Sequence, residues 1–354
     1  MYRYIHGGEI QPYLEQFSID VGKIVDFSVN INPLGAPDIV ANNWLKLFKD
    51  VEKYPTSTAC GVLDFYNRRF GIDKENVVAA NGSIELFYLA YKALNIKKVA
   101  IVEPSFYDYK RASEINGCRI FSIVLKEKNN FEFVLDRESL GIIEKSDAVI
   151  FANPNNPTGK MVNKERILEL IKRYKDKWFL IDEAFIQFSN EFKDKSFMFC
   201  GLDNVVIFHS LTKFYALAGL RIGAAIGKKE VIDRFKDIIH PWCVNRVAEN
   251  VTRLLINCKD YEKKSLDFIN TEKKRIYECL KGCNGIKLFK TDANFFLAKW
   301  FGSDNLDDLL KYLLEKGMFV RDCRNFYGLS GNFFRFAILK KYQNSKLIDA
   351  LCEL

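Results

Sequence analysis

Between Asn76 and Gly227, short apolar runs alternate with stretches whose apolar residues recur at helical spacing. We interpret the runs as buried strands, because they are short, nearly continuous in apolar residues and bounded by polar or turn-forming residues. Strands separated by helices pair in parallel, and the helices then cover both faces of the sheet. The pattern therefore predicts an α/β fold with a mostly parallel, seven-stranded sheet. The strands are predicted at Val77–Ala80, Val99–Val102, Arg119–Val124, Ala148–Ala152, Trp178–Ile181, Val205–Phe208 and Ile222–Ile226.

Beyond Gly227 the pattern changes to long charged helices, predicted at Lys228–His240 and Asn250–Lys281 with a break at Pro241. A smaller α+β domain follows, because short apolar runs reappear on either side of one further helix. We expect an N-terminal arm with part of the small domain at 1–45, a large domain at 46–240 and a C-terminal small domain at 241–354. In the small domain we predict one helix at Leu306–Lys316 and a final helix. Its strands are predicted at Ile286–Lys290, Asn294–Trp300, Met318–Arg321 and Phe333–Ile338.

The N-terminal segment is polar and irregular, so its regular elements are expected to be short. Asp26 to Ile31 alternates like a short strand, and Asn32-Pro-Leu-Gly closes it with turn-forming residues. A helix is predicted from Gly61 to Phe70. The sequence contains no internal repeat and no low-complexity linker.

Composition places the chain among globular proteins that bury a substantial core, since 48% of its 354 residues are hydrophobic and 28% are charged. It has no run of about 18 apolar residues and no signal-peptide core at its start, so we expect a cytoplasmic protein without a membrane partner. The net charge is +8, but basic residues are interspersed with 45 acidic ones, which argues against nucleic acid as a partner. Nine cysteines without a C-x-x-C pair, and only three histidines, predict reduced thiols rather than disulfides or a metal site.

One long motif follows the predicted strand Val205–Phe208: Ser210-Leu-Thr-Lys-Phe-Tyr-Ala-Leu-Ala-Gly-Leu-Arg-Ile-Gly. Open α/β sheets build their sites at the carboxyl ends of strands, so Lys213 is expected in such a site. The hydroxyls of Ser210 and Thr212 and the guanidinium of Arg221 can converge on one phosphate, while the lysine amine can condense with an aldehyde. An isolated lysine after a strand is usually a surface residue, but this pattern is long and specific. It resembles the cofactor-lysine signature of fold-type I pyridoxal-phosphate (PLP) enzymes, the aminotransferases and their decarboxylase relatives, which implies PLP attached at Lys213.

Two further strand ends carry groups that suit this cofactor. Gly82, Ser83 and Ile84 join the first strand to a helix, so their N–H groups can bind an anion, although Asn-Gly-Ser is also an ordinary helix cap. Asp182 ends the fifth strand, where a buried carboxylate is costly unless it is paired. Its natural partner is the pyridinium N–H of PLP, whose retained proton lets the ring accept electrons. We therefore assign Lys213 and Asp182 as catalytic residues.

The resemblance implies roles for three more residues. Phe106 matches the aromatic residue that stacks on the pyridine ring, although a core aromatic is the alternative. Asn156, within Asn-Pro-Asn-Asn-Pro-Thr-Gly, is placed like the family asparagine that donates to the phenolic oxygen of the cofactor, and we expect it to contact substrate as well. Tyr54 matches a tyrosine that reaches the cofactor phosphate of a partner subunit, which implies a homodimer, with a simple anchoring aromatic before Pro55 as the alternative.

Both ends of the chain narrow the resemblance further. His6-Gly-Gly, followed by Asp-Phe-Ser-x-Asn-Ile-Asn-Pro-Leu-Gly from Asp26, resembles the opening of the threonine-phosphate decarboxylases. Histidinol-phosphate aminotransferases open differently, with an Asn-Glu-Asn-Pro-Tyr-Gly type of sequence. The segment that begins at Arg321 resembles Arg-Asp-Cys-x-Asn-Phe-x-Gly-Leu of the same decarboxylases. Phe185 stands where aminotransferases usually have a tyrosine and these decarboxylases often have phenylalanine.

The expected substrate is a small phosphorylated amino acid, which needs one anion site for its carboxylate and another for its phosphate. Guanidinium groups suit both anions because their forked donors bind paired oxygens. We expect Arg335 to bind the carboxylate and Arg321 the phosphate, although the sequence allows the reverse assignment and structural ion pairs are the alternative. His6, Gly7 and Asn30 are expected to complete the phosphate site.

The reaction type is less constrained, because the same electron sink serves decarboxylation, transamination and racemisation. The resemblance favours decarboxylation of an O-phospho amino acid, with L-threonine O-3-phosphate as first choice. A histidinol-phosphate or related aminotransferase is the alternative. A non-catalytic PLP-binding regulator is a third interpretation, which we favour less because such regulators usually carry a DNA-binding domain and this chain begins in the substrate arm.

Overall fold

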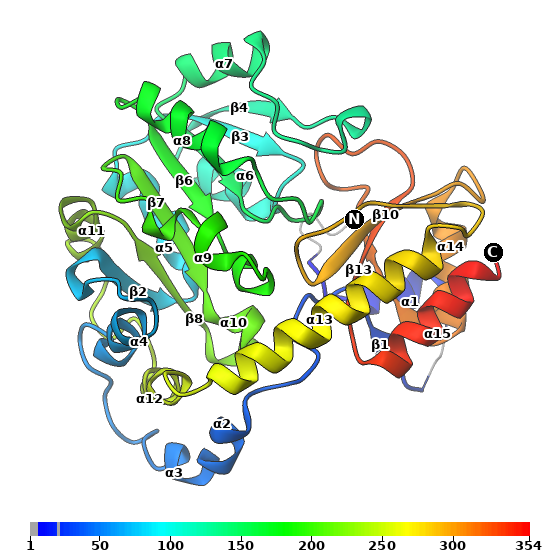
Figure 1. Cartoon of the computed structure of the whole chain (residues 1–354), viewed down its shortest axis with the longest axis horizontal. Coiled ribbons are helices and arrows are strands. Elements are labelled where there is room, and N and C mark those ends of the chain that lie inside the picture. Colours follow the sequence, from blue (N-terminus) through cyan, green and yellow to red (C-terminus); the bar gives the residue numbers. More distant parts are fainter. Residues whose placement is uncertain (1–5, 20–21) are drawn as a thin grey trace.

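The computed structural model describes residues 6–19 and 22–354, and its largest element is a seven-stranded sheet (Figure 1). The strand order is β2-β8-β7-β6-β5-β3-β4, and within this sheet only β8 runs antiparallel to its neighbours. The predicted α/β class and mostly parallel sheet are therefore confirmed. The strands are β2 (Val77–Asn81), β3 (Lys98–Glu103), β4 (Arg119–Val124), β5 (Ala148–Ala152), β6 (Trp178–Asp182), β7 (Val205–Ser210) and β8 (Ile222–Ile226).

Both faces of this sheet are buried except at the edge strand β4, which is partly exposed, and successive residues of a strand point to opposite faces. In β2, Val77 and Ala79 pack into one core cluster, while Val78 and Ala80 pack into the other. This burial explains why the strands form continuous apolar runs in the sequence. The first cluster includes residues of α4 (Cys60–Phe70), α7 (Arg137–Glu144), α8 (Lys164–Arg173) and α12 (Arg246–Leu255); the second includes residues of α5 (Ser83–Ala93), α6 (Tyr107–Ile115) and α11 (Lys229–Lys236).

A smaller antiparallel sheet, in the order β12-β13-β10-β9, lies to the right in Figure 1. The N-terminal arm joins this part of the molecule, because β1 pairs in parallel with β11. The predicted division into domains at residues 45 and 240 stays a prediction. The elements here are β1 (Val25–Asp26), β9 (Ile286–Leu288), β10 (Phe295–Trp300), β11 (Met318–Phe319), β12 (Arg321–Asp322), β13 (Phe333–Ala337), α1 (Gln11–Phe17), α14 (Leu306–Glu315) and α15 (Lys341–Cys352).

The predicted helix Asn250–Lys281 is wrong in one respect, because it is two helices. After α12 the chain turns at Asn257, and α13 (Lys259–Leu280) then runs across the molecule to the smaller sheet (Figure 1). Asparagine competes with a helix through local hydrogen bonds and favours such a turn. Short helices complete the fold, among them α2 (Asp38–Asn42), α3 (Trp44–Phe48), α9 (Phe192–Lys195) and α10 (Leu211–Phe214).

The predicted strand Asp26–Ile31 is also shorter than expected, since pairing ends at Asp26. Oδ1 of Asp26 accepts hydrogen bonds from the backbone N–H (2.7 Å) and the hydroxyl (2.6 Å) of Ser28. Such local side-chain bonds offer the backbone an alternative to strand pairing. The arm therefore leaves the sheet after two residue pairs and continues toward the cavity, whose wall includes Ser28 and Asn30.

The prediction of reduced cysteines without disulfides is wrong for one pair. Cys283 and Cys352 form a disulfide across 69 residues of sequence. They lie near the ends of α13 and α15, two helices that pack against each other, so the fold brings together thiols whose proximity no sequence spacing could show. The free cysteines are Cys60, Cys118, Cys200, Cys243, Cys258, Cys279 and Cys323.

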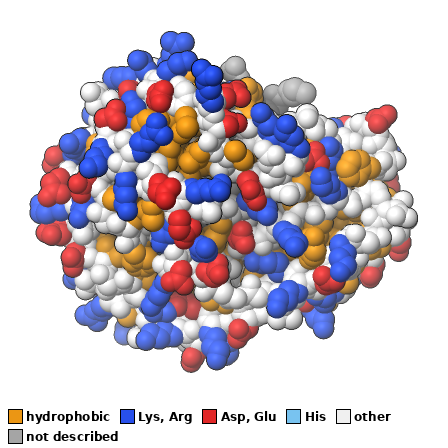
Figure 2. All heavy atoms as spheres, turned by 45° about the horizontal axis from the view of Figure 1, so that its top comes forward, with side chains coloured by type: hydrophobic (Ala, Val, Ile, Leu, Met, Phe, Trp, Pro, Cys, Tyr) orange, Lys and Arg blue, Asp and Glu red, His pale blue; other side chains and the backbone are white. Residues whose placement is uncertain are grey.

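Two surface properties follow the composition. On the face drawn in Figure 2, basic and acidic side chains are interspersed. Within the described ranges, no helix is both long and apolar enough to cross a membrane.

Candidate active site

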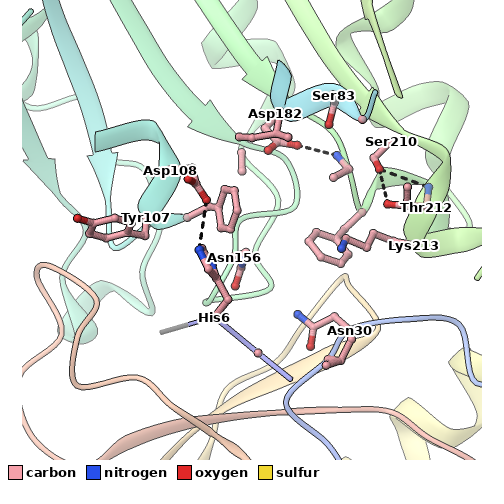
Figure 3. Close-up of a pocket in the computed structure, with 18 of the residues that line it drawn as sticks. His6, Asn30, Ser83, Tyr107, Asp108, Asn156, Asp182, Ser210, Thr212 and Lys213 are labelled. Carbon is pink, nitrogen blue, oxygen red and sulfur yellow. Dashed lines mark hydrogen bonds and ion pairs between the residues drawn. The ribbon is translucent and has the colours of Figure 1, made fainter. Parts of the chain in front are cut away.

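A cavity of about 380 Å³ lies where β5, β6 and β7 end, between the large sheet, the N-terminal arm and the smaller sheet (Figure 3). The structure gathers nearly all the predicted site residues in its wall, and only Tyr54 among them lies elsewhere. The predicted residues that line the cavity are His6, Gly7, Asn30, Gly82, Ser83, Ile84, Phe106, Asn156, Asp182, Ser210, Thr212, Lys213, Arg221, Arg321 and Arg335.

Sheet register explains why distant motifs meet at this edge. Ser210 ends β7 and pairs with Gly223 of the antiparallel strand β8, so Arg221 lies just before β8 at the same edge. Asn81 ends β2 and pairs with Ile222 on the other side of β8, which places the turn at Gly82 beside Arg221. The single antiparallel strand therefore brings the start of α5 next to the long motif after β7.

The start of α5 and Arg221 form a cradle that suits a phosphate. Gly82 has a φ of +86°, and a Cβ there would lie only 2.6 Å from Nη2 of Arg221. The N-terminal N–H groups of α5 begin at Ser83. The hydroxyls of Ser210 and Thr212 lie 2.7 Å apart at the same edge. A helix N-terminus, a guanidinium and two hydroxyls together provide the donors and the positive field that a phosphate requires.

Lys213 lies on the short helix α10, with its amine inside the cavity wall (Figure 3). Burial lowers the pKa of this amine from 10.5 to about 8, and the cations of Arg221 and Arg335 act in the same direction, while Asp182 opposes them. A lowered pKa leaves more of the amine uncharged near neutral pH, and the uncharged amine is the nucleophile.

Asn32 ties the N-terminal arm to this helix, a connection that sequence analysis missed. Its backbone N–H donates to the carbonyl of Lys213 (3.1 Å), and its Nδ2 donates to the carbonyl of Phe214 (2.8 Å) and to the hydroxyl of Ser265 (2.8 Å) on α13. The side chain is buried. The turn-forming asparagine of Asn-Pro-Leu-Gly therefore also fixes the backbone on which Lys213 stands.

Asp182 is partly buried at the end of β6 and is held from two sides. Oδ2 accepts a hydrogen bond from the hydroxyl of Tyr109 (2.6 Å), and Oδ1 accepts one from the N–H of Ala184 (2.8 Å). Burial raises the pKa of Asp182, and these two hydrogen bonds oppose that rise. Tyr109 was missed by sequence analysis, although it follows Phe106 by three residues on the first turn of a helix and so shares its face.

Arg321 and Arg335 lie directly opposite each other in the pairing of β12 with β13, and both are buried. Arg335 donates to Oδ1 of Asn156 and to the carbonyl of Ser28 (2.8 Å). Burial lowers the pKa of Arg335 to about 10, and Arg321 contributes to the shift. Among residues 6–19 and 22–354, Arg335 makes no ion pair. Two cations across a strand pair destabilise a fold, so this pair indicates an anion site.

The N-terminal arm closes the cavity with a tight turn at His6 to Gly8. A Cβ on Gly7 would lie 2.3 Å from the carbonyl oxygen of Ser28, and the N–H of Gly8 donates to the hydroxyl of Ser28 (2.7 Å). The glycines therefore permit the arm to pack on itself at the cavity wall. Asn30 is buried, and its Oδ1 has no hydrogen-bond partner among the described residues.

The aromatic predictions have different outcomes. Phe106 lines the cavity, with its ring centroid 5.8 Å from that of His6. Phe185 packs edge-on against Phe295 at 5.1 Å in the wall. Tyr54 is 80% exposed and lies outside the cavity.

Comparison with known proteins adds a decisive observation. The model of the family "Aminotransferase class I and II" matches residues 22–351. The chain belongs to this family. It is a PLP-dependent enzyme of fold-type I, and pyridoxal phosphate is the cofactor.

Three relatives of this aminotransferase-family chain are informative. A protein of Caldanaerobacter subterraneus subsp. tengcongensis, which bears the provisional name threonine-phosphate decarboxylase, is 34% identical over 98% of this chain and 93% of its own. The threonine-phosphate decarboxylase of Salmonella typhimurium is 28% identical, covering 98% and 95%. The crystal structure of the histidinol-phosphate aminotransferase of Clostridium acetobutylicum superposes with a TM-score of 0.85 at 31% identity, covering 92% and 97%.

The wall of the cavity fits PLP at three places. The cradle at Gly82 and Arg221 suits its phosphate, Lys213 its aldehyde carbon and Asp182 its ring nitrogen. The close approach of the Arg221 guanidinium to Gly82, at a backbone φ of +86°, is the feature that ordinary helix capping does not explain.

Proposed function

We propose that this protein decarboxylates an O-phospho amino acid, with L-threonine O-3-phosphate as its substrate. The products are (R)-1-aminopropan-2-yl phosphate and carbon dioxide, and we place the reaction in cobalamin biosynthesis and in the cytoplasm. The names of two relatives, at 34% and 28% identity, support the decarboxylase, while the aminotransferase structure at 31% identity keeps transamination as the alternative.

The observation that carries the proposal is the buried pair Arg321 and Arg335 opposite Lys213. The cradle around Gly82 and Arg221 already accounts for the cofactor phosphate. Two further guanidinium groups in the same cavity then match a substrate with two more anions, a carboxylate and a phosphate. We keep the assignment in which Arg335 binds the carboxylate of the substrate and Arg321 binds its phosphate.

Each polar residue of the cavity has a separate role in the proposed reaction. When bound, PLP accepts the electron pair left at the substrate α-carbon as the bond to the carboxylate breaks. Asp182 holds the proton on the ring nitrogen, and Asn156 keeps its amide nitrogen as a donor because its oxygen faces Arg335. Arg335 sets the direction of the carboxylate, and the amine of Lys213 can return a proton to the α-carbon.

The arm and the apolar wall favour decarboxylation because they exclude water. His6, Gly7 and Asn30 cover the cavity beside the arginine pair. In such a site a substrate carboxylate bound by Arg335 would have little water around it, which would favour its loss as neutral carbon dioxide. Phe185 is a separate difference from the aminotransferases. A tyrosine at that place would donate a hydrogen bond to the phenolic oxygen of the cofactor, and phenylalanine cannot.

The experiment compares two substrates. The enzyme is incubated with L-threonine O-3-phosphate, and separately with histidinol phosphate plus 2-oxoglutarate, while carbon dioxide and glutamate are measured. Carbon dioxide in amounts equal to the substrate consumed, without glutamate, is expected. Sustained glutamate formation without carbon dioxide would assign the protein to the aminotransferases.

A homodimer is part of the same proposal. Large exposed apolar side chains gather from α3 to Tyr54, and Trp242 lies beside them with its ring centroid 5.3 Å from that of Tyr54. Exposed apolar groups of this density mark an interface. The set is Trp44, Leu45, Phe48, Val51, Tyr54 and Trp242. A partner packed on this patch would let Tyr54 contribute to the neighbouring cofactor site.

A further inference from the structure

The cavity wall contains one carboxylate that the proposed reaction does not use. Asp108, on the first turn of α6, is largely buried and lines the same cavity as Lys213. Its Oδ1 accepts a hydrogen bond from the hydroxyl of Tyr88 (2.9 Å), and its Oδ2 lies 3.7 Å from Nε2 of His6, as the dashed line in Figure 3 shows. A carboxylate is unfavourable in a cavity built for anions unless a cation lies between it and the ligand.

His6 lies at the cavity wall between Asp108 and the rest of the N-terminal arm. The rest of its turn is held within the arm, by the bond from Gly8 to Ser28. In the part of the chain that the structure describes, the contacts of His6 with the large sheet and its helices are the Asp108 carboxylate and the Phe106 ring. Asp108 therefore connects the N-terminal arm to α6 across the cavity.

The chemistry of imidazole gives this contact a direction. At 3.7 Å the contact is longer than a hydrogen bond, but a carboxylate only accepts hydrogen bonds, so it favours the tautomer with a hydrogen on the ring nitrogen that faces it. Nδ1 of His6 is then the nitrogen left for a ligand. In the neutral ring Nδ1 would be an acceptor, which a phosphate cannot use, whereas in the protonated ring it is a donor.

We propose that Asp108 is a positioning residue that orients His6 as a hydrogen-bond donor for the substrate phosphate, with Tyr88 fixing the carboxylate. The inference rests on the proposed phosphorylated substrate. The carboxylate of Asp108 would by itself repel the phosphate. In this proposal it instead orients His6, which binds the phosphate.

The test is a double-mutant cycle on the holoenzyme, with KM and kcat measured for L-threonine O-3-phosphate and for unphosphorylated L-threonine. Asp108→Asn should raise the KM for the phosphorylated substrate about tenfold, keep kcat within about twofold and leave L-threonine unaffected. In a His6→Ala background the same change should cause no further loss, because the residue that it positions is gone. Glu114→Gln, an exposed carboxylate on the same helix, is the matched control and should change neither KM.

Two results would overturn the inference. One is an Asp108→Asn enzyme that binds the phosphorylated substrate as well as the wild type does or better. The other is a loss of equal size in the His6→Ala background or on L-threonine, which would show that Asp108 only supports the packing of α5 and α6.

The cycle also separates this inference from the proposed reaction. If the enzyme transaminates, the measurement is repeated with histidinol phosphate and histidinol, and the coupling between Asp108 and His6 should remain because it depends on the phosphate alone. A wild-type enzyme that does not distinguish the phosphorylated from the unphosphorylated member of either pair would reject the inference together with the substrate class.

Discussion

At the scale of single residues, Lys213 shows how burial prepares a side chain for chemistry. Burial lowers the pKa of its amine to about 8, and the group is protonated and unreactive below that value. Starting from cofactor-free protein, the rate constant of holoenzyme formation should rise about tenfold per pH unit below pH 8 and level off above it. Stopped-flow absorbance with excess PLP measures this dependence. The absorbance change that accompanies holoenzyme formation should be missing in Lys213→Ala.

A rate that kept rising toward pH 10.5 would mean that the amine titrates like an exposed lysine. The buried position of Lys213 would then have no effect on its reactivity.

Asp182 and Tyr109 allow a graded prediction. Asp182→Asn should lower kcat by about 10² or more, because a neutral amide cannot keep the proton on the pyridine nitrogen. Tyr109→Phe removes the 2.6 Å hydrogen bond to Oδ2 but keeps the carboxylate, so it should lower kcat only about five- to tenfold. PLP binding, followed by its visible absorbance, should persist in both. A larger loss for Tyr109→Phe than for Asp182→Asn would contradict these roles.

Sequence could indicate the residues that carry chemistry more readily than the residues that hold them. Lys213 and Asp182 follow apolar runs, so their places at strand ends could be predicted from the pattern alone. Tyr109 is 73 residues from Asp182 along the chain, and Asn32 is 182 residues from Phe214, to which it donates. Contacts at such separations depend on how elements pack, which no local pattern records.

At the scale of elements, the turn into α5 supports a test with a matched control. Gly82 and Gly35 both have positive φ values, but a Cβ would meet Arg221 at Gly82 and no atom within 4 Å at Gly35. Alanine at either position should cost about 1 kcal/mol of unfolding free energy. Gly82→Ala should in addition weaken PLP binding at least about tenfold, since it displaces a phosphate donor. PLP affinity is measured by fluorescence titration. Equal affinity in the two variants would contradict the claim that the turn at Gly82 and Arg221 bind the cofactor phosphate.

The predicted elements were accurate where burial dictates the pattern. Strands of the large sheet are apolar on both faces, so their positions are visible in the sequence within a residue or two. The pattern failed at Asn257, where a local turn divides a continuous charged helix, and at Ser28, where side-chain bonds to Asp26 end a strand. The disulfide between Cys283 and Cys352 likewise depends on the packing of two helices.

At the scale of the whole molecule, the apolar patch around α3 predicts the assembly. Leu45 is 82% exposed and Phe48 is 65% exposed, so Leu45→Glu with Phe48→Glu should disrupt a dimer without disturbing the core. Sedimentation velocity should show a dimer for the wild type and a monomer for this variant. PLP affinity should fall with dissociation, because Tyr54 of a partner could no longer contribute.

Tyr342→Glu, on the exposed side of α15, is the control and should leave the dimer intact. A wild-type protein that is monomeric and fully active would exclude this assembly.

The cavity itself is a property of the whole chain. The sequence indicated its parts, but the position of the arm depends on the pairing of β1 with β11, which lie near opposite ends of the chain. The pairing of β12 with β13 then places Arg321 and Arg335 opposite each other. That arrangement is what makes a doubly anionic substrate the expected ligand.

The most direct measurement of the central claim is to run the reaction in D₂O with L-threonine O-3-phosphate labelled with ¹³C in its carboxyl group. Decarboxylation predicts that the label appears entirely in carbon dioxide and that the aminopropanol phosphate carries one deuterium on the carbon that lost the carboxyl group. Labelled carboxylate retained in a keto acid, with the amino group transferred to the cofactor, would contradict the account.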